Sequence, residues 1–257
     1  MKSKAVWAWA FADWANSAYT TTVIAVFFPI FFKQYWAAAL PADQSTFYLG
    51  LSNSINSIIL FLVAPFLGAL ADISGRKKLY LLFFTAVGSL TLIAFYFINQ
   101  GEWLWALIFY TVSNVGYWIG NIFYDALIMN VSDDENISFV SSLGYSLGYL
   151  GGGLLIVLNA WMVQSPETFG LANKAAAVQW SFLSVCFWWI LFSIPLYIFV
   201  PEQGTGGERL SFVKTMHQVW GTLKKMRGQH SIFLFLVAYI FYIDGVNTII
   251  KMAVDFA

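Results

Sequence analysis

Long runs of apolar residues recur along the chain, and they constrain its fold more than any other feature. A helix needs about 20 mostly apolar residues to cross about 30 Å of hydrocarbon. Windows of this kind predict seven spans, near residues 5–32, 47–71, 79–98, 103–130, 137–163, 176–200 and 231–254. The runs are longer than barrel strands and lack their strict alternation. We therefore expect an all-α polytopic membrane protein.

The composition agrees with a lipid bilayer as the solvent. Hydrophobic residues make up 60% of the chain and charged residues 10%, with a mean hydropathy of +0.70. A water-soluble fold could not cover so much apolar surface with so few charges. The formal net charge is zero, which gives no reason to expect nucleic acid as a partner. The sequence contains no phosphate-binding glycine loop and no Cys/His metal cluster, so no cofactor and no metal are expected.

The basic residues predict the orientation, because cytoplasmic loops of membrane proteins carry an excess of Lys and Arg. With the N-terminus in the cytoplasm, the outer side receives only Lys33 and Lys174. The cytoplasmic side receives ten: Lys2, Lys4, Arg76, Lys77, Lys78, Arg209, Lys214, Lys224, Lys225 and Arg227. We expect an integral membrane protein with a cytoplasmic N-terminus.

Three carboxylates fall inside the first, fourth and seventh predicted spans: Asp13, Asp125 and Asp244. A charge in hydrocarbon costs roughly 3 kcal/mol on insertion scales, so an acid retained there usually lines a water-filled path for an ion or solute. Asp13-x-x-Asn16 in the first span recurs as Asp244-x-x-Asn247 in the seventh. A spacing of three puts both polar groups on one face of a helix, and all five residues are predicted to form a substrate or proton site.

Asn121 completes this predicted site, because it lies four residues before Asp125 and on the same helix face. For Asn114, seven residues earlier, a hydrogen bond between helices is the favoured interpretation. Two roles stay open for the aspartates. Burial disfavours the charged form of a carboxylate, so one of them could take up and release a proton. An ionised aspartate could equally bind the ammonium group of a substrate.

The loop after the second span carries the most specific motif, Gly68-Ala69-Leu70-Ala71-Asp72-Ile73-Ser74-Gly75-Arg76-Lys77-Lys78. It resembles the loop between helices 2 and 3 of the major facilitator superfamily, G-x-L-a-D-r-x-G-R-k-x. The resemblance implies that Gly68 allows close helix approach and that Asp72 pairs with Arg76 and a facing helix end to latch one conformation. An ordinary tight turn on the positive side would explain the basic residues, but it would not explain the glycines and the acid at these spacings.

Three further segments resemble one branch of that superfamily, the vacuolar amino-acid effluxers of autophagy and their bacterial relatives. They are residues 13–19, 144–152 and 242–247, and the resemblance covers the whole chain. It implies a twelve-helix secondary active transporter of amino acids or similar small polar solutes that works by alternating access. The bacterial relatives imply a bacterial cell (inner) membrane as its location. In such a fold helices 1, 4 and 7 surround the central cavity. The fourth span has no basic residue, so arginine-based proton coupling is not implied.

The domain organisation follows from the order of the spans. Residues 1–200 are predicted to form a six-helix transmembrane domain, and residues 201–230 a cytoplasmic amphipathic linker. Residues 231–257 would be the first helix of an incomplete second transmembrane domain. Because the chain ends five helices short of the family, we expect an N-terminal fragment that lacks its C-terminal helices. The alternative is a non-transporting membrane subunit or remnant that needs a partner chain.

The fifth span contains Gly144, Gly148 and Gly152 at four-residue spacing, which is typical of a close-packing stripe between membrane helices. It also contains a literal G-x-S-x-G around Ser146, so an intramembrane serine hydrolase is a remote alternative. That chemistry needs a strand-to-helix turn and a histidine base. Both histidines lie in the predicted linker, and we expect no enzyme.

The tryptophans allow two interpretations. Together with Tyr19, they could line an aromatic cage for a cationic amine: Trp7, Trp9, Trp14, Trp188 and Trp189. Anchoring at the membrane interface is the simpler explanation for tryptophans near span ends, and we favour it.

Overall fold

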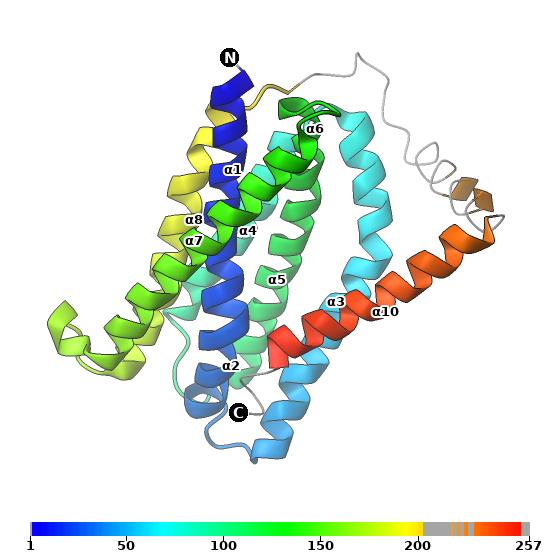
Figure 1. Ribbon diagram of the computed structural model, residues 1–257. Helices are drawn as coiled ribbons and strands as arrows, with labels where there is room; N and C mark the ends of the chain where they lie inside the picture. The colour runs from blue at the N-terminus through cyan, green and yellow to red at the C-terminus, as the bar shows by residue number, and fades with distance from the viewer. Residues whose placement is uncertain (1, 203–216, 218–219, 222–223, 226–228, 253–257) are drawn as a thin grey trace.

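The computed structural model describes residues 2–202, 217, 220–221, 224–225 and 229–252 (Figure 1). Every regular element in this part of the chain is a helix, so the expected all-α polytopic fold is confirmed. The long helices are α1 Lys2–Ala18, α3 Ala42–Ser74, α4 Lys77–Phe95, α5 Trp103–Ala126, α7 Ile137–Gln164, α8 Lys174–Phe199 and α10 His230–Met252. The short ones are η1 Tyr19–Phe27, α2 Phe28–Phe31, η2 Phe32–Trp36, α6 Ile128–Val131 and η3 Pro166–Phe169.

Six helical stretches are long and apolar enough to cross a membrane: Ser3–Trp36, Ala42–Ala71, Lys77–Phe95, Ile137–Gln164, Lys174–Phe199 and His230–Ile250. They correspond to six of the seven predicted spans. The predicted fourth span is α5, whose 24 residues would extend about 36 Å. Its length suffices, but it is not among these six stretches, because Asn114, Asn121 and Asp125 stand between its tyrosines and tryptophans and lower its mean hydropathy. A membrane crossing by α5 stays a prediction.

The first span was predicted as one membrane helix, but in the structure it alternates between α-helical and π-helical segments. After α1 the backbone widens into the π-helix η1, and a second π-helical segment, η2, follows the short α2. At the start of η1 the hydroxyls of Thr20 and Thr21 both donate to the carbonyl of Ser17, at 2.9 Å. Such hydroxyls compete with the backbone for carbonyl oxygens, and Pro29 further along has no N–H to donate. Short π-helical segments are frequent at functional sites.

The turns between helices are set by particular residues. Gly75 has a φ of 58°, in the left-handed region that glycine adopts without strain, and it ends α3 one residue before the N-cap of α4. At the start of α8 the side chain of Asn173 accepts a hydrogen bond from the amide of Ala176 at 2.9 Å, as an N-cap does. These two ends fix the directions in which α4 and α8 leave their loops.

Two lysines at the start of α4 tie three helices together at one end of the bundle. The ammonium of Lys77 donates to the carbonyl of Ala126 at 2.9 Å, in the last turn of α5. The ammonium of Lys78 donates to the carbonyls of Tyr197 at 3.1 Å and Val200 at 2.9 Å, at the end of α8. Unpaired carbonyls and the helix dipole make a helix C-terminus attractive to a cation. The basic residues of this loop therefore have a packing role.

The interior contains two apolar clusters. One is rich in aromatic rings and joins η1, α2 and η2 to the first half of α5 and to α8; Phe28, Trp36 and Phe182 belong to it. The other joins the first turns of α1 to the second half of α5 and the end of α8; Trp9 and Phe123 belong to it. Asn16 of α1 and Asn121 of α5 lie near the level where the two clusters meet, which we call the polar layer. Asp125 lies in the last turn of α5, beside the second cluster.

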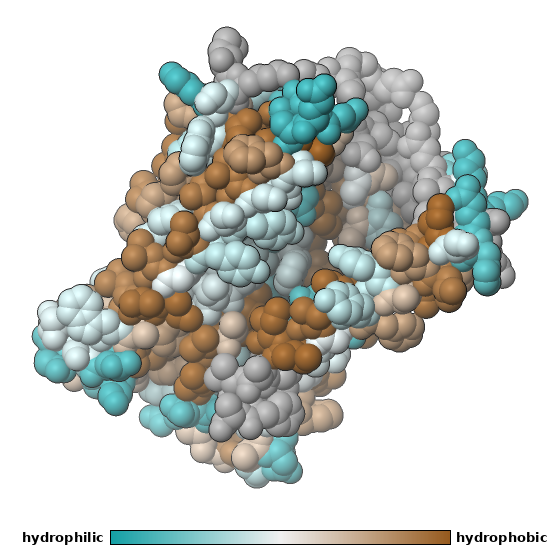
Figure 2. Space-filling view, viewed as in Figure 1, coloured by the Kyte–Doolittle hydropathy of each residue, from teal (hydrophilic) through white to brown (hydrophobic). Residues whose placement is uncertain are grey.

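The outer surface is largely apolar, as Figure 2 shows for the visible face. On α3 the side chain of Phe61 is 69% exposed, and on α10 that of Phe241 is 75% exposed. Large exposed apolar areas indicate contact with another apolar phase. With the span lengths, they support an integral membrane protein.

Candidate functional site

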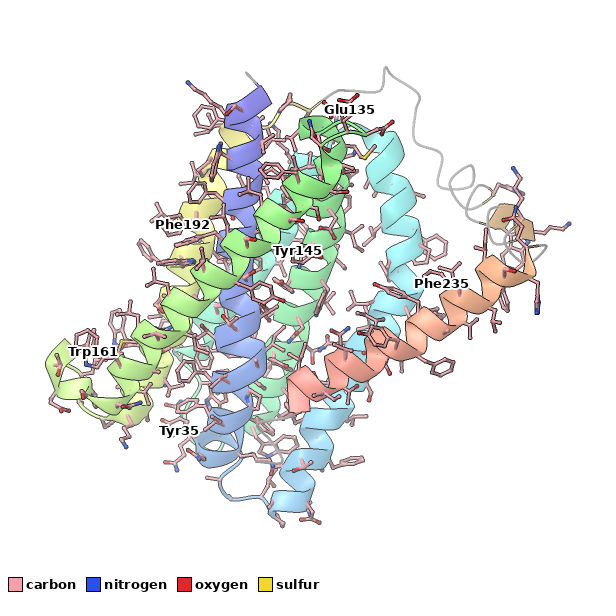
Figure 3. All side chains as sticks on the ribbon, viewed as in Figure 1. Tyr35, Glu135, Tyr145, Trp161, Phe192 and Phe235 are labelled. Atoms are coloured by element: carbon pink, nitrogen blue, oxygen red, sulfur yellow. The ribbon has the colours of Figure 1, made fainter. Side chains whose placement is uncertain are left out.

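A cavity of about 770 Å³ lies beside the polar layer and is lined by four parts of the chain. The first span contributes Asp13, Ser17 and Thr20, and α5 contributes Asn121 and Asp125. Tyr145 and Tyr149 come from α7, and Asn247 comes from α10. Tyr145 lies near the middle of α7 (Figure 3). Among the lining residues there is no lysine, arginine or histidine, so the described wall is acidic and rich in hydroxyls and aromatic rings.

The two carboxylates of the cavity lie on facing helices. The side chain of Asp13 is half-buried and that of Asp125 is exposed, and both line the same cavity. Like charges that share one site repel each other, and a bound cation or a proton on one of them relieves the repulsion. The chemistry available here is therefore binding of a positive group or transfer of a proton.

Asp13 lies against the predicted glycine stripe of α7. A Cβ placed at Gly148 would be 2.5 Å from Ser17 Oγ and 3.3 Å from Asp13 Oδ2, and one at Gly144 would be 2.8 Å from a ring carbon of Trp9. At Gly152 it would be 2.9 Å from Thr21 Oγ1. All three glycines are buried. The absent side chains let α1 and α7 approach closely, and they leave room for the carboxylate.

Aromatic pairs border the polar layer on both sides. Trp9 and Tyr124 stack with ring centroids 4.7 Å apart. The indole of Trp9 donates to the Tyr124 carbonyl at 3.1 Å, and the Tyr124 hydroxyl donates to the Trp9 carbonyl at 3.2 Å. On the other side Tyr19 stacks on Tyr117, also at 4.7 Å. These pairs join α1 and η1 to α5 and fix the spacing of the two helices that carry the aspartates.

A buried hydrogen-bonded chain crosses three helices behind the cavity wall. Asn16 on α1 is 4% exposed; its Oδ1 accepts from the indole of Trp189 on α8 at 2.6 Å, and its Nδ2 donates to Oδ1 of Asn121 on α5 at 3.1 Å. Asn16 therefore lies behind Asn121 and outside the cavity lining, although the sequence predicted it in the site. Asn114, predicted to bond between helices, donates instead to the carbonyl of Tyr110 in its own helix.

The interfacial anchoring favoured for the tryptophans is wrong for two of them. Trp9 is 4% exposed and Trp189 1% exposed, both inside the bundle, whereas Trp7 is 48% exposed. Trp189 had been considered for an aromatic cage, whereas sequence reasoning missed Tyr117 and Tyr124 as neighbours of the site. The only signal was that tryptophans and tyrosines recur on the helices that carry the asparagines and aspartates.

The predicted switch loop is partly described. Gly68 has open space where a Cβ would stand, so no close helix approach occurs there in this structure. Asp72 belongs to the last turn of α3, and its side chain lies outside the described residues. Gly75 ends α3, and Arg76 is exposed at the N-cap of α4. The latch stays a prediction.

The two polar residues predicted on the seventh span lie in different places. Asn247 lines the cavity. Asp244, one turn earlier on α10, is exposed and does not belong to the lining. The structure thus brings Asp13, Asn121, Asp125 and Asn247 to one cavity, with Asn16 behind it. The amphipathic pattern predicted within residues 201–230 lies mostly outside the described residues.

The residues of the hydrolase alternative are not arranged for that reaction. Ser146 is in the middle of α7, where its hydroxyl donates to the carbonyl of Ser142 at 2.8 Å. His217 and His230 are both exposed, and neither lines the cavity. Over the described residues, no three His, Cys, Asp or Glu side chains form a group that could hold a metal ion.

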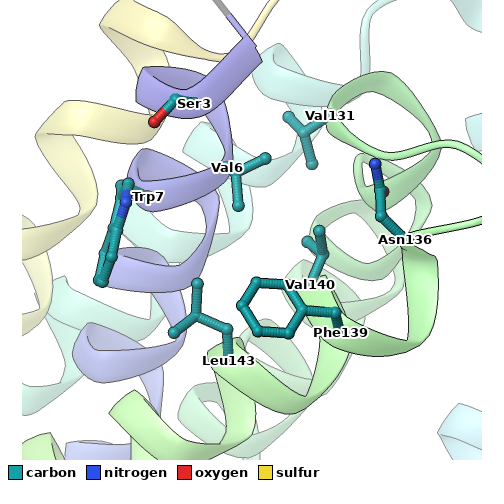
Figure 4. Close-up of a pocket in the computed structure, with 8 residues that line it drawn as sticks. All are labelled: Ser3, Val6, Trp7, Val131, Asn136, Phe139, Val140 and Leu143. Carbon is teal, nitrogen blue, oxygen red and sulfur yellow. The ribbon is translucent and has the colours of Figure 1, made fainter.

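A smaller groove of about 370 Å³ lies between the first turns of α1 and α7 (Figure 4). Valines, a leucine and aromatic rings form most of its wall, with Ser3 and Asn136 as the polar members. Its described lining has no charged side chain and only these two polar ones, so it is less suited to a polar solute than the larger cavity. The larger cavity is the candidate site.

Comparison with known proteins agrees with this architecture. The profile of the family described as "Vacuole effluxer Atg22 like" matches residues 1–136 and 129–257. An uncharacterized MFS-type transporter of Bacillus subtilis (strain 168), YxiO, is 37% identical over 252 residues, which are 96% of this chain and 59% of the relative. A protein of Aquifex aeolicus (strain VF5) is 24% identical over 95% of this chain and 55% of its own length. Autophagy-related protein 22 of Yarrowia lipolytica is 26% identical over 57% of this chain and 28% of the relative.

The chain thus spans about half the length of the two bacterial relatives, 59% and 55%. The family profile covers the first span, the switch loop, α5, α7 and α10, which are the elements that form the cavity or were singled out by their motifs. The chain belongs to the vacuole effluxer Atg22-like family.

Proposed function

We propose that this chain forms the cavity-bearing part of a secondary active transporter for small polar solutes of the amino-acid class, which works by alternating access. The observation that supports this most is the cavity itself. Two carboxylates, two amides and several hydroxyls from four helical segments converge on about 770 Å³, enough for a small solute. A membrane protein rarely keeps such groups inside its spans without an ion or solute to handle.

The same cavity supports a proposal about the coupling ion. Asp13 and Asp125 line one cavity. Two ionised carboxylates repel each other there, and a solute ammonium would neutralise one of them. A proton on the other would remove the remaining charge before the cavity closes on apolar surroundings. Transport would then be proton-coupled, with the ammonium and the proton on different aspartates.

Uptake measurements test this function. The full-length protein would be reconstituted into liposomes, and uptake of labelled L-alanine, L-phenylalanine, L-lysine and L-glutamate would be measured with and without an inward proton gradient. We expect uptake of at least one amino acid, stimulated by the gradient. Asp13→Asn and Asp125→Asn should each lower kcat/KM about tenfold to hundredfold, because each removes a charge-assisted hydrogen bond or a proton site.

Asp43→Asn is the matched control, since Asp43 is an exposed acid at the start of α3 and outside the cavity. It should transport like the unmodified protein. Uptake of none of the amino acids would overturn the proposed solute class. Equal rates for Asp13→Asn, Asp125→Asn and Asp43→Asn would remove the aspartates from the mechanism, and rates independent of the proton gradient would remove proton coupling alone.

A further inference from the structure

The chain from Trp189 through Asn16 to Asn121 has a fixed direction. An indole N–H can only donate a hydrogen bond. The atom of Asn16 that faces Trp189 at 2.6 Å must therefore be the amide oxygen. The amide nitrogen of Asn16 then points the other way, toward Asn121 at 3.1 Å. Because an amide nitrogen only donates, Asn121 must present its oxygen to Asn16.

This direction determines what Asn121 presents to the cavity. Its oxygen is engaged behind the wall, so its NH₂ group is the end left for the space in front, and Asn121 belongs to the cavity lining. The group has two N–H donors.

The fixed donor matters because the nearby charged groups have the opposite character. Asp13 and Asp125, when ionised, can only accept hydrogen bonds, and both line the same cavity. An amide that could rotate freely would present its oxygen or its NH₂ with similar ease. An amide held by a buried chain presents the donor every time, without the cost of ordering it when the solute binds.

We propose that Trp189 and Asn16 are positioning residues that hold the Asn121 amide with its NH₂ toward the cavity, where it binds an acceptor group of the solute, such as a carboxylate or carbonyl oxygen. The proposal rests on the proposed function, because it concerns the same cavity. It assigns a specificity role to two residues that never touch the solute. Without the indole N–H, the side-chain amides of Asn16 and Asn121 can both rotate by 180°. Asn121 then presents its amide oxygen, in place of its NH₂ group, to the solute.

The test compares Trp189→Phe with Trp188→Phe. Trp188 is the neighbour of Trp189 on α8, and its indole donates to the backbone carbonyl of Trp14 at 3.3 Å. This acceptor is not a side-chain amide, so the loss of the hydrogen bond cannot rotate an asparagine. Both variants replace an indole by a benzene ring and remove one N–H. Binding would be measured by titration calorimetry on the full-length protein in lipid nanodiscs. The probes are three pairs of an amino acid and its decarboxylated amine: L-alanine and ethylamine, L-phenylalanine and 2-phenylethylamine, L-lysine and 1,5-diaminopentane.

For each amino acid that the unmodified protein binds, Trp189→Phe should raise the Kd about tenfold, the effect of one hydrogen bond to a charged group. The Kd of the matching amine should stay within about twofold, because the amine has no acceptor for Asn121. Trp188→Phe should change neither. If Trp189→Phe weakens amino acid and amine equally, or weakens neither, the positioning role is wrong. Asn16→Ala interrupts the chain one step later and serves as the second variant should Trp189→Phe fail to fold.

A spectroscopic readout separates this proposal from the proposed function. In protein labelled with ¹⁵N at the tryptophan indoles, the resonance absent from Trp189→Phe belongs to Trp189, and a short hydrogen bond should shift its proton downfield. Asn16→Ala should move this resonance upfield, while the Trp188 resonance keeps its position. If no probe binds to the unmodified protein, the proposed solute class fails. The position of this resonance then still shows whether the hydrogen bonds from Trp189 to Asn16 and on to Asn121 are formed. An unmoved Trp189 resonance in Asn16→Ala would overturn the proposal.

Discussion

Asp13 occupies space that is left free by a glycine on the neighbouring helix α7. Its carboxylate carbon lies 3.2 Å from where a Cβ at Gly148 would stand, and Ser17 Oγ lies 2.5 Å from that point. The observed position of the Asp13 carboxylate therefore depends on the absence of a side chain at Gly148. A methyl group at Gly148 cannot be accommodated unless Ser17 and Asp13 move.

Gly148→Ala is accordingly expected to destabilise the protein by about 1–3 kcal/mol, the usual cost of overpacking a close contact, and to weaken solute binding because Asp13 is displaced. Thermal unfolding in detergent and calorimetric titration would measure the two effects. Gly153→Ala is the control on the same helix, since a Cβ there meets nothing within 4 Å. A Tm of Gly148→Ala equal to that of Gly153→Ala would show that α1 and α7 have more room than the structure indicates.

At the scale of helices, apolar length determined most of what could be predicted. The second span was predicted over 47–71 and α3 covers Ala42–Ser74; the sixth was predicted over 176–200 and α8 covers Lys174–Phe199. Hydrophobic windows find the part of a helix inside hydrocarbon but miss its ends in the interface. The π-helical η1 could not be predicted, because threonines in an apolar run do not reveal which carbonyls they take.

The site was predicted less completely than the spans. Spacing placed Asp13 and Asn16 on one face of α1, yet Asp13 lines the cavity and Asn16 lies behind it, bonded to α5 and α8. Likewise Asn247 lines the cavity while Asp244 does not. A shared face is about 100° wide, so its two edges can contact different neighbours. Which edge faces the cavity depends on the packing of the other helices, and a single helix does not encode it.

The end of α3 supports a prediction about an element boundary. Gly75 has a φ of 58°, which costs an ordinary L-residue about 1–2 kcal/mol. Gly75→Ala should therefore lower the thermal stability of the bundle, while Gly75→Asn should lower it less, because asparagine tolerates this conformation through local hydrogen bonds. Melting of the two variants side by side provides the measurement. If alanine is tolerated as well as asparagine, the α3–α4 turn does not require a left-handed residue.

Over the whole molecule, basic and acidic residues are equal in number but differ in where they lie. The chain has 13 basic and 13 acidic residues, whereas the described lining of the cavity has two acids and no base. Low-dielectric walls concentrate the field of such charges. The cavity should therefore enrich cations near its wall, and this enrichment can be measured without knowledge of the solute.

Cysteine labelling measures this field directly. The chain has one cysteine, Cys186, which is buried, so a Cys186→Ala background accepts single reporters. Ser141 lines the cavity, so Ser141→Cys places the reporter there. Leu150 lies on the same helix with its side chain 63% exposed, and Leu150→Cys is the control. Two methanethiosulfonate reagents are compared, one with a cationic trimethylammonioethyl group and one with an anionic sulfonatoethyl group. The cationic reagent should modify Ser141→Cys about tenfold faster than the anionic one, after correction for their rates with free 2-mercaptoethanol. Leu150→Cys should react slowly with both, because lipid excludes charged reagents and keeps the thiol protonated. Equal corrected rates at Ser141→Cys would mean that the carboxylates do not set the potential of the cavity, and fast reaction at Leu150→Cys would mean that the outer face of α7 contacts water.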